Sequence, residues 1–499
     1  MLFNSFAFAV FLPLVFILYW IFFNRKNATL RNFFLLIASY FFYAWWDWRF
    51  LSLIIISSTM DYFLGLKLDS LNREESTTSE SGGSLEKLQR QKKMWLLISV
   101  VTNIGFLGFF KYFGFFAESL SVLVSTFGIT LSPVTLNIIL PVGISFYTFQ
   151  TLSYTIDIYY KKAESTKSWV QFFAFVAFFP QLMAGPIERA KNFLPQFAEL
   201  HKPDYKIFRS AMLQIAWGFF KKIMVADRVA VLVDKVYADI PAAEGLPLLL
   251  GVVFFALQLY LDFSAYSDIA IGTARLFGFQ LRRNFMRPYM STSFGNFWKR
   301  WHISLSSWFQ DYVYIPLGGS RKGLSRTKIN VLIVFALSGL WHGASWNFVI
   351  WGILNALFLV LIDPVLNLIK KENTTKDNVV IWGFKSVLIF TCWALSLIFF
   401  RAQGFDAALD GFRHLSFANF DNIVNFGLTA IELKFTFILI GILLLKGLIW
   451  EKSETLVPDY FYKAPAILRW IFYIVFVLFM VYFGQYGDGN ENSFIYFQF

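Results

Sequence analysis

The chain contains few charged residues and almost no cysteine. Only 15% of its 499 residues are charged, against roughly 25% in soluble domains, whereas 57% are hydrophobic and the mean hydropathy is +0.55. The single cysteine, Cys392, excludes a disulfide framework and argues against a zinc–thiolate site. The sequence has neither a metal-binding motif nor a Gly-rich nucleotide loop, so we expect no bound metal or cofactor. This composition predicts an all-α polytopic membrane protein.

Apolar stretches recur along the whole sequence, and a bilayer crossing needs about 20 such residues. Several stretches are short or interrupted by Gly and Pro. We therefore expect about 10 to 13 transmembrane helices, with re-entrant or amphipathic helices, in a single domain over residues 1–499. The polar, Gly- and Ser-rich sequence Asn72–Ser84 predicts a flexible cytoplasmic loop within residues 67–93.

The net charge of +12 arises largely from segments that would share one side of the membrane. Lys and Arg cluster in the 67–93 segment and in residues 321–328, while the aromatic tail 484–499 has none. Because cytoplasmic loops are enriched in Lys and Arg, both termini are expected to be extracytoplasmic. The first apolar stretch has no basic start and no cleavage site, so we expect a retained span. Such a charge pattern gives no indication of nucleic-acid binding.

One histidine lies inside an apolar stretch. His342 stands in the sequence SGLWHGASWN, fourteen residues after Lys328. At about 1.5 Å per residue, a helix from that point places it roughly 20 Å into a hydrocarbon core about 30 Å thick. On a continuous helix, Ser338, His342 and Ser345 would share one face. An ionisable group at this depth is costly, which predicts a catalytic role; the alternative is a structural histidine bonded to a neighbouring helix.

A second histidine, His302, occupies a different setting. It begins the segment HISLSSWFQDYVYIPLGG, which cannot simply span because Lys299, Arg300 and Asp311 lie in or beside it. On a helical wheel His302 falls on the apolar arc, so it either packs in the core or lines an internal passage. Lys299 and Arg300 are candidates for contacting phosphate or acidic groups, and membrane-surface anchoring explains them equally well.

Two carboxylates lie in the apolar sequence YLDFSAYSD, namely Asp262 and Asp268. Acidic side chains at or near membrane depth are candidate substrate contacts. The alternative is that they cap helices or form hydrogen bonds between helices.

Several long stretches resemble the membrane-bound O-acyltransferase family. They are RRNFMRPYMSTSFGNFWKRWHISLSSWFQDYVYIPLGGSR, SGLWHGASWNFVIWG, LPVGISFYTFQTLSYTIDIY, FFPQLMAGPIERAKNFLPQF and YLDFSAYSDIAIG. The likeness is greatest to bacterial alginate O-acetylation proteins and teichoic acid D-alanyl transfer proteins, and the chain length favours the former. By this resemblance His342 matches the family's active-site histidine and His302 its second motif position. It also implies helices around a central funnel or tunnel.

The resemblance implies an O-acyltransferase, and most simply an O-acetyltransferase. A thioester reacts with a hydroxyl only if a base removes the proton and the oxyanion is stabilised. His342 would be that base, and Trp341 or Asn347 would donate to the oxyanion, with Ser338 and Ser345 as further substrate contacts. The donor would be acetyl-CoA or an acyl-carrier thioester. The acceptor would be an extracytoplasmic polysaccharide, such as alginate or another cell-surface glycan.

The C-terminal sequence NSFIYFQF resembles acyl-tyrosine C-termini of related systems. Tyr496 is therefore a candidate transient acyl carrier, since a phenol ester is more reactive than an alkyl ester. The alternative is an aromatic anchor at the membrane surface. The resemblance further implies membrane lipids, a secreted or periplasmic acetyltransferase and an acyl carrier protein as partners, in the bacterial inner membrane.

Three other functions stay open from the sequence. A transporter or flippase of an acylated or lipid-linked intermediate also uses broken helices and buried polar groups. A D-alanyl transfer protein would have similar motifs. An accessory subunit would only scaffold a secreted acetyltransferase, without chemistry at His342.

Overall fold

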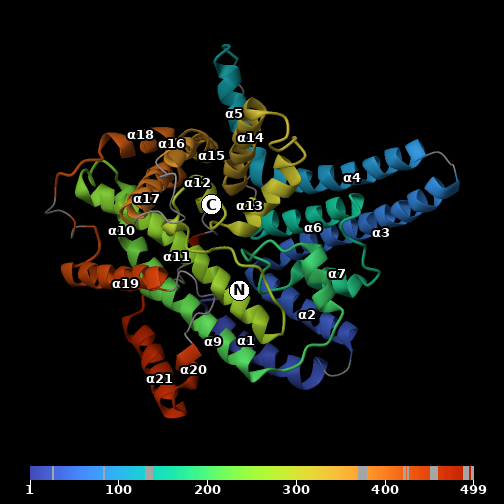
Figure 1. Ribbon diagram of the computed structural model, residues 1–499, viewed down its shortest axis with the longest axis horizontal. Helices are drawn as coiled ribbons and strands as arrows, with labels where there is room; N and C mark the ends of the chain where they lie inside the picture. Colours follow the sequence, from blue (N-terminus) through green and yellow to red (C-terminus); the bar gives the residue numbers. More distant parts are fainter. Residues whose placement is uncertain are drawn as a thin grey trace. The chain divides into compact units, whose positions relative to one another are not determined.

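The computed structural model describes all residues except 25–26, 82–84, 130–138, 369–378, 420–422, 424–425, 450–458, 487–493 and 496–499 (Figure 1). The described residues form helices joined by turns and contain no β-strand, which confirms the all-α class. They group into two compact units, Met1–Met212 with Ala270–Arg282, and Leu213–Ile269 with Arg283–Phe499. The assignment of residues 1–499 to a single domain stays a prediction.

Eight helical stretches in the described part of the chain are long and apolar enough to cross a bilayer. They are Phe6–Phe23, Ala28–Thr77, Leu85–Ser125, Leu246–Leu276, Leu324–His342, Trp346–Leu368, Val379–Arg401 and Ala466–Phe483. These stretches confirm a polytopic membrane protein. The second and third are 50 and 41 residues long, more than one crossing requires. The expected total of about 10 to 13 crossings stays a prediction.

Helices of the first unit pack against helices that are near and far in the sequence. α3 contacts α4 and α6, and α2 contacts α7. The α-helices that lie wholly in this unit are α1 (Phe6–Leu18), α2 (Ala28–Asp47), α3 (Leu51–Ser81), α4 (Leu85–Leu107), α5 (Phe113–Ser125), α6 (Ile144–Tyr159), α7 (Trp169–Ala177) and α8 (Ala190–Phe193).

The segment expected to be a flexible loop, residues 67–93, is largely helical. α3 continues to Ser81 and α4 begins at Leu85, and these two long helices lie side by side (Figure 1). The Glu75 carboxylate joins them, because its Oε2 lies 2.9 Å from Lys92 Nζ on α4. Polar composition did not distinguish the two structures, because an exposed helix has the same composition as an exposed loop.

The second unit contains every side chain of the candidate site. Its helices include η5 (Phe220–Ala226), α10 (Asp227–Ala238), α12 (Phe294–Trp298), α13 (Ile303–Phe309), α14 (Leu324–His342), α15 (Trp346–Leu357), α16 (Asp363–Leu368), α17 (Val379–Arg401), α18 (Phe405–Arg413), α19 (Ala430–Ile449), α20 (Asp459–Lys463) and α21 (Ala466–Phe483). Two further helices, α9 (Tyr205–Phe219) and α11 (Leu246–Leu276), have residues in both units. Buried aromatic and aliphatic side chains of α11, α15 and α17 form the core.

Glycines bring α14 and α15 into backbone contact. A Cβ atom placed at Gly339 would lie 2.1 Å from the Phe348 carbonyl oxygen, and one at Gly352 would lie 2.2 Å from that of Phe335. Only residues without a side chain allow this approach, which is how small residues pack helices in membranes. The contact fixes the end of α14, where His342 lies.

Candidate active site

His302 and His342 line the same cavity in the second unit. The remaining lining residues are aliphatic or aromatic: Leu259, Phe263, Trp301, Trp351, Trp393 and Phe400. Both histidines are buried, with 1% of His302 and 9% of His342 exposed. The volume open to the centres of water molecules is about 10 Å³, which is room for about one water. The cavity is therefore small and, apart from the two imidazoles, apolar.

His342 is the last residue of α14. Its ring packs edge-on against Trp351 of α15, at 5.2 Å between centroids, and against Phe400 of α17, at 5.5 Å. The helix ends there because the next residue, Gly343, is extended. The ring of Phe348 occupies the space where a Gly343 side chain would lie. His342 is therefore buried and borders the cavity, and its catalytic role stays a prediction.

His302 lies at a break between two short helices rather than inside one. α12 ends at Trp298 and α13 begins at Ile303, so a continuous helical wheel through this segment was wrong. His302 has φ 40° and ψ 55°, in the left-handed region that non-glycine residues rarely adopt. Asn284 supports this turn: its backbone oxygen accepts from the Ile303 N–H at 2.9 Å, and its Oδ1 accepts from the Ser304 hydroxyl at 2.7 Å.

The two imidazoles face each other across the cavity. Their ring centroids are 6.4 Å apart and the planes are inclined by 53°. The Phe263 ring lies edge-on to His302 at 4.7 Å. Burial, reinforced by the neighbouring His342, lowers the pKa of His302 well below its usual range. His302 is therefore neutral at pH 7, and a neutral imidazole has one N–H donor and one basic nitrogen.

Among the other predicted residues of this motif, only Trp341 contacts the histidines. Its ring lies 5.1 Å from that of His342 and 5.9 Å from that of His302. Ser345 does not share a helical face with His342, because α14 has ended; it caps α15 instead, accepting from the Asn347 N–H. Ser338 is partly exposed on α14 and does not line the cavity.

Asn347 is engaged elsewhere. Its side-chain amide donates to the carbonyl oxygens of Ala402, at 3.2 Å, and Gly404, at 2.8 Å. These bonds hold the chain that follows α17, so Asn347 supports the cavity wall from outside and does not line it. Its prediction as an oxyanion donor was wrong for this arrangement, because both amide hydrogens are directed at the backbone.

The four predicted charged residues do not line the histidine cavity. Lys299 is exposed and Arg300 half-buried, in the turn between α12 and α13. Asp268 lies 2.7 Å from Lys221, and Asp262 lies 2.7 Å from Lys222. The two aspartates therefore join α11 to η5 through ion pairs, in line with the alternative that they bond between helices.

Sequence reasoning missed two groups of residues. The first is the aromatic lining supplied by Trp351, Trp393 and Phe400. In an apolar span nothing distinguishes these rings from lipid-facing ones. The second is the pair Lys221 and Lys222, both buried in the middle of a helical segment. Two adjacent lysines within an apolar stretch could have predicted a buried ion-pair cluster, because buried ammonium groups require carboxylate partners.

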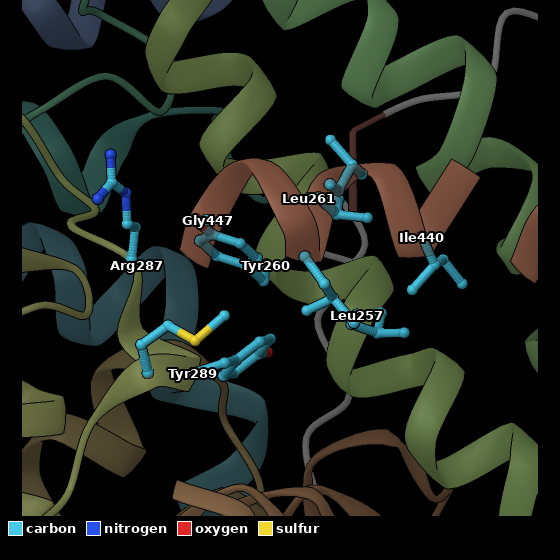
Figure 2. Close-up of a pocket in the computed structure, with 10 residues that line it drawn as sticks. Leu257, Tyr260, Leu261, Arg287, Tyr289, Ile440 and Gly447 are labelled. Carbon is cyan, nitrogen blue, oxygen red and sulfur yellow. The ribbon is translucent and has the colours of Figure 1, made fainter. Parts of the chain in front are cut away.

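A larger cavity lies on another side of α11 (Figure 2). Its open volume for water centres is about 60 Å³. Aliphatic side chains of α11 and α19 form most of the wall, with Arg287, Tyr260 and Tyr289 beside them. Neither histidine borders it. In the described residues, no group of three or more His, Cys, Asp or Glu side chains could hold a metal ion.

Comparison with known proteins places the chain in a family. The model of MBOAT, the membrane-bound O-acyltransferase family, matches residues 40–402. The probable alginate O-acetylase AlgI of Pseudomonas putida is 39% identical over 407 residues, covering 81% of this chain and 78% of that protein. The peptidoglycan O-acetyltransferase of Helicobacter pylori is 32% identical over 438 residues, covering 82% and 78%.

A teichoic acid D-alanyltransferase of Streptococcus thermophilus is also similar, at 29% identity over 251 residues, but covers only 47% of this chain. The family match contains both cavity histidines, and the relatives that align over most of the chain are named for O-acetylation. The chain belongs to the membrane-bound O-acyltransferase family and is a multi-pass membrane O-acetyltransferase.

Proposed function

We propose that this protein passes an acetyl group from a cytoplasmic thioester to the hydroxyl of an extracytoplasmic polysaccharide, such as alginate or another cell-surface glycan. The observation that carries the proposal is the small, otherwise apolar cavity lined by His302 and His342. Relatives named for alginate and peptidoglycan acetylation support a glycan acceptor. The donor is acetyl-CoA or the thioester of an acyl carrier protein.

In this mechanism His342 is the general base. Its neutral imidazole accepts the hydroxyl proton while the hydroxyl oxygen attacks the thioester carbonyl carbon. The resulting oxyanion collapses, the carbon–sulfur bond breaks, and the imidazolium returns the proton to the leaving sulfur. His302 and Trp341 are candidate donors to the oxyanion, because their ring centroids lie 6.4 Å and 5.1 Å from that of His342.

The aromatic walls exclude water, which protects the thioester from hydrolysis. Because the cavity holds only about one water molecule, lining side chains must move when the substrates enter. The donor enters from the His302 side in the cytoplasm, and both chain termini lie on the opposite side of the bacterial inner membrane. Tyr496, which lies outside the described residues, relays the acetyl group to a secreted acetyltransferase that modifies the polymer.

The test is thioester turnover by His342→Ala in purified, lipid-reconstituted protein given labelled acetyl-CoA. We expect a loss of about 100-fold or more, the usual contribution of a general base. His414→Ala is the matched control, since His414 lies after α18 and its Nδ1 contacts the Asp410 carbonyl. Full turnover in His342→Ala would contradict the mechanism and return the protein to a scaffold or transport role.

A further inference from the structure

The C-terminal end of the chain returns to the core of the second unit after its last long helix. α21 ends at Phe483, and the Gln485 N–H then donates to the Ile223 carbonyl oxygen at 2.9 Å. Further along, Phe494 and Ile495 are buried, with 1% and 2% of their surface exposed. Chain ends are ordinarily poorly ordered unless something ties them down.

A buried ion cluster binds this end. Lys222 Nζ lies 2.7 Å from one oxygen of Asp262 and 2.8 Å from Asp227. The second oxygen of Asp262 accepts the Ile495 N–H at 2.6 Å. Lys222 also lies over the face of the Phe494 ring, 4.5 Å from its centroid. The Asp262 carboxylate is a strong acceptor for a backbone N–H donor, because hydrogen bonds to ionised groups are stronger than those between neutral groups.

This cluster adjoins the histidine cavity through α11. Asp262 and Tyr266 are one helical turn apart, and the Phe494 ring packs edge-on against Tyr266 at 5.1 Å. Leu259 and Phe263, which line the cavity, lie on the same side of α11, because residues three and four apart share a face. The bound chain end is therefore beside the cavity wall.

We infer that Asp262 and Lys222 form a binding site for the protein's own C-terminal end, and that Asp262 is a positioning residue for it. The ligand is the backbone N–H of Ile495 together with the Phe494 ring. A cluster needed only for stability would be poorly chosen, because burying charges costs about as much as their attraction returns. The binding site rests on the contacts above; a part for the bound end in acyl transfer rests on the proposed function.

The cluster provides its own matched pair of variants. Asp262→Ala and Asp227→Ala each remove one carboxylate and leave Lys222 paired with the other, so both are expected to fold. Of the two carboxylates, Asp262 is the one that accepts the Ile495 N–H. The measurement is amide hydrogen exchange of the C-terminal peptide by mass spectrometry on the full-length, lipid-reconstituted protein, with Tm recorded in parallel.

We expect Asp262→Ala to raise exchange of this peptide about tenfold or more, the equivalent of losing a hydrogen bond to a charged group. Asp227→Ala should leave it unchanged. Phe494→Ala, which removes the ring that packs against Tyr266 and Lys222, should also raise it in protein whose Tm shows that it is folded. Unchanged exchange in a folded Asp262→Ala or in Phe494→Ala overturns the inference.

The outcome separates this inference from the proposed function. Loss of turnover in His342→Ala with no change of exchange in Asp262→Ala keeps the enzyme mechanism and removes the binding site. Raised exchange in Asp262→Ala with full turnover in His342→Ala keeps the binding site and removes the mechanism.

Discussion

Gly339→Ala should disable the enzyme without touching a side chain of the cavity. The new Cβ would lie 2.1 Å from the Phe348 carbonyl oxygen, whereas ordinary contact begins at 3.4 Å. The obstacle is backbone, so α14 and α15 must separate by about 1 Å. His342 lies three residues along α14, and its neighbour Trp351 lies on α15. Since a misplacement of about 1 Å can cost on the order of 100-fold in rate, we expect that loss in turnover.

The assay is turnover of labelled acetyl-CoA with Tm measured on the same sample. Gly383→Ala on α17 and Gly441→Ala on α19 are the controls, because a Cβ at either position meets nothing within 4 Å. Alanine is favoured over glycine inside a helix by about 0.5 to 1 kcal/mol, so these controls should keep full turnover and stability. A folded Gly339→Ala with normal turnover would refute the idea that backbone contact between α14 and α15 positions His342.

Three further variants probe the remaining roles. His302→Ala should lower turnover about 100-fold or more if its N–H stabilises the oxyanion, and a folded variant with normal turnover would leave His302 a packing residue. Lys222→Ala leaves Asp227 and Asp262 buried without their cation, which should reduce stability by about 3 to 5 kcal/mol, measured as a fall in Tm. Tyr496→Phe should abolish acetylation of the polymer in cells at unchanged protein levels; normal acetylation would eliminate the carrier role.

The two histidines illustrate how far sequence reasoning reached. The cost of an imidazole in an apolar span identified His342, and the structure brings it together with His302. The helical wheel through His302 was wrong because it assumed one helix, whereas the chain turns at a left-handed residue held by Asn284. Asn284 lies eighteen positions before His302 in the chain. Hydrophobic periodicity predicts local helices and strands, so it cannot predict a hydrogen bond between residues this far apart.

Composition and hydrophobic pattern alone determined the membrane class and the helical architecture and made His342 a candidate site residue, because each follows from the free energy of moving residues out of water. Tertiary structure alone decided which groups share the cavity. Asn347, Asp262 and Asp268 have polar side chains that could contact a substrate. Instead, the Asn347 amide donates to a backbone carbonyl oxygen, and each aspartate pairs with a buried lysine. These partners lie far away in the sequence. The packing of the helices therefore determines which buried polar groups form hydrogen bonds or ion pairs with each other.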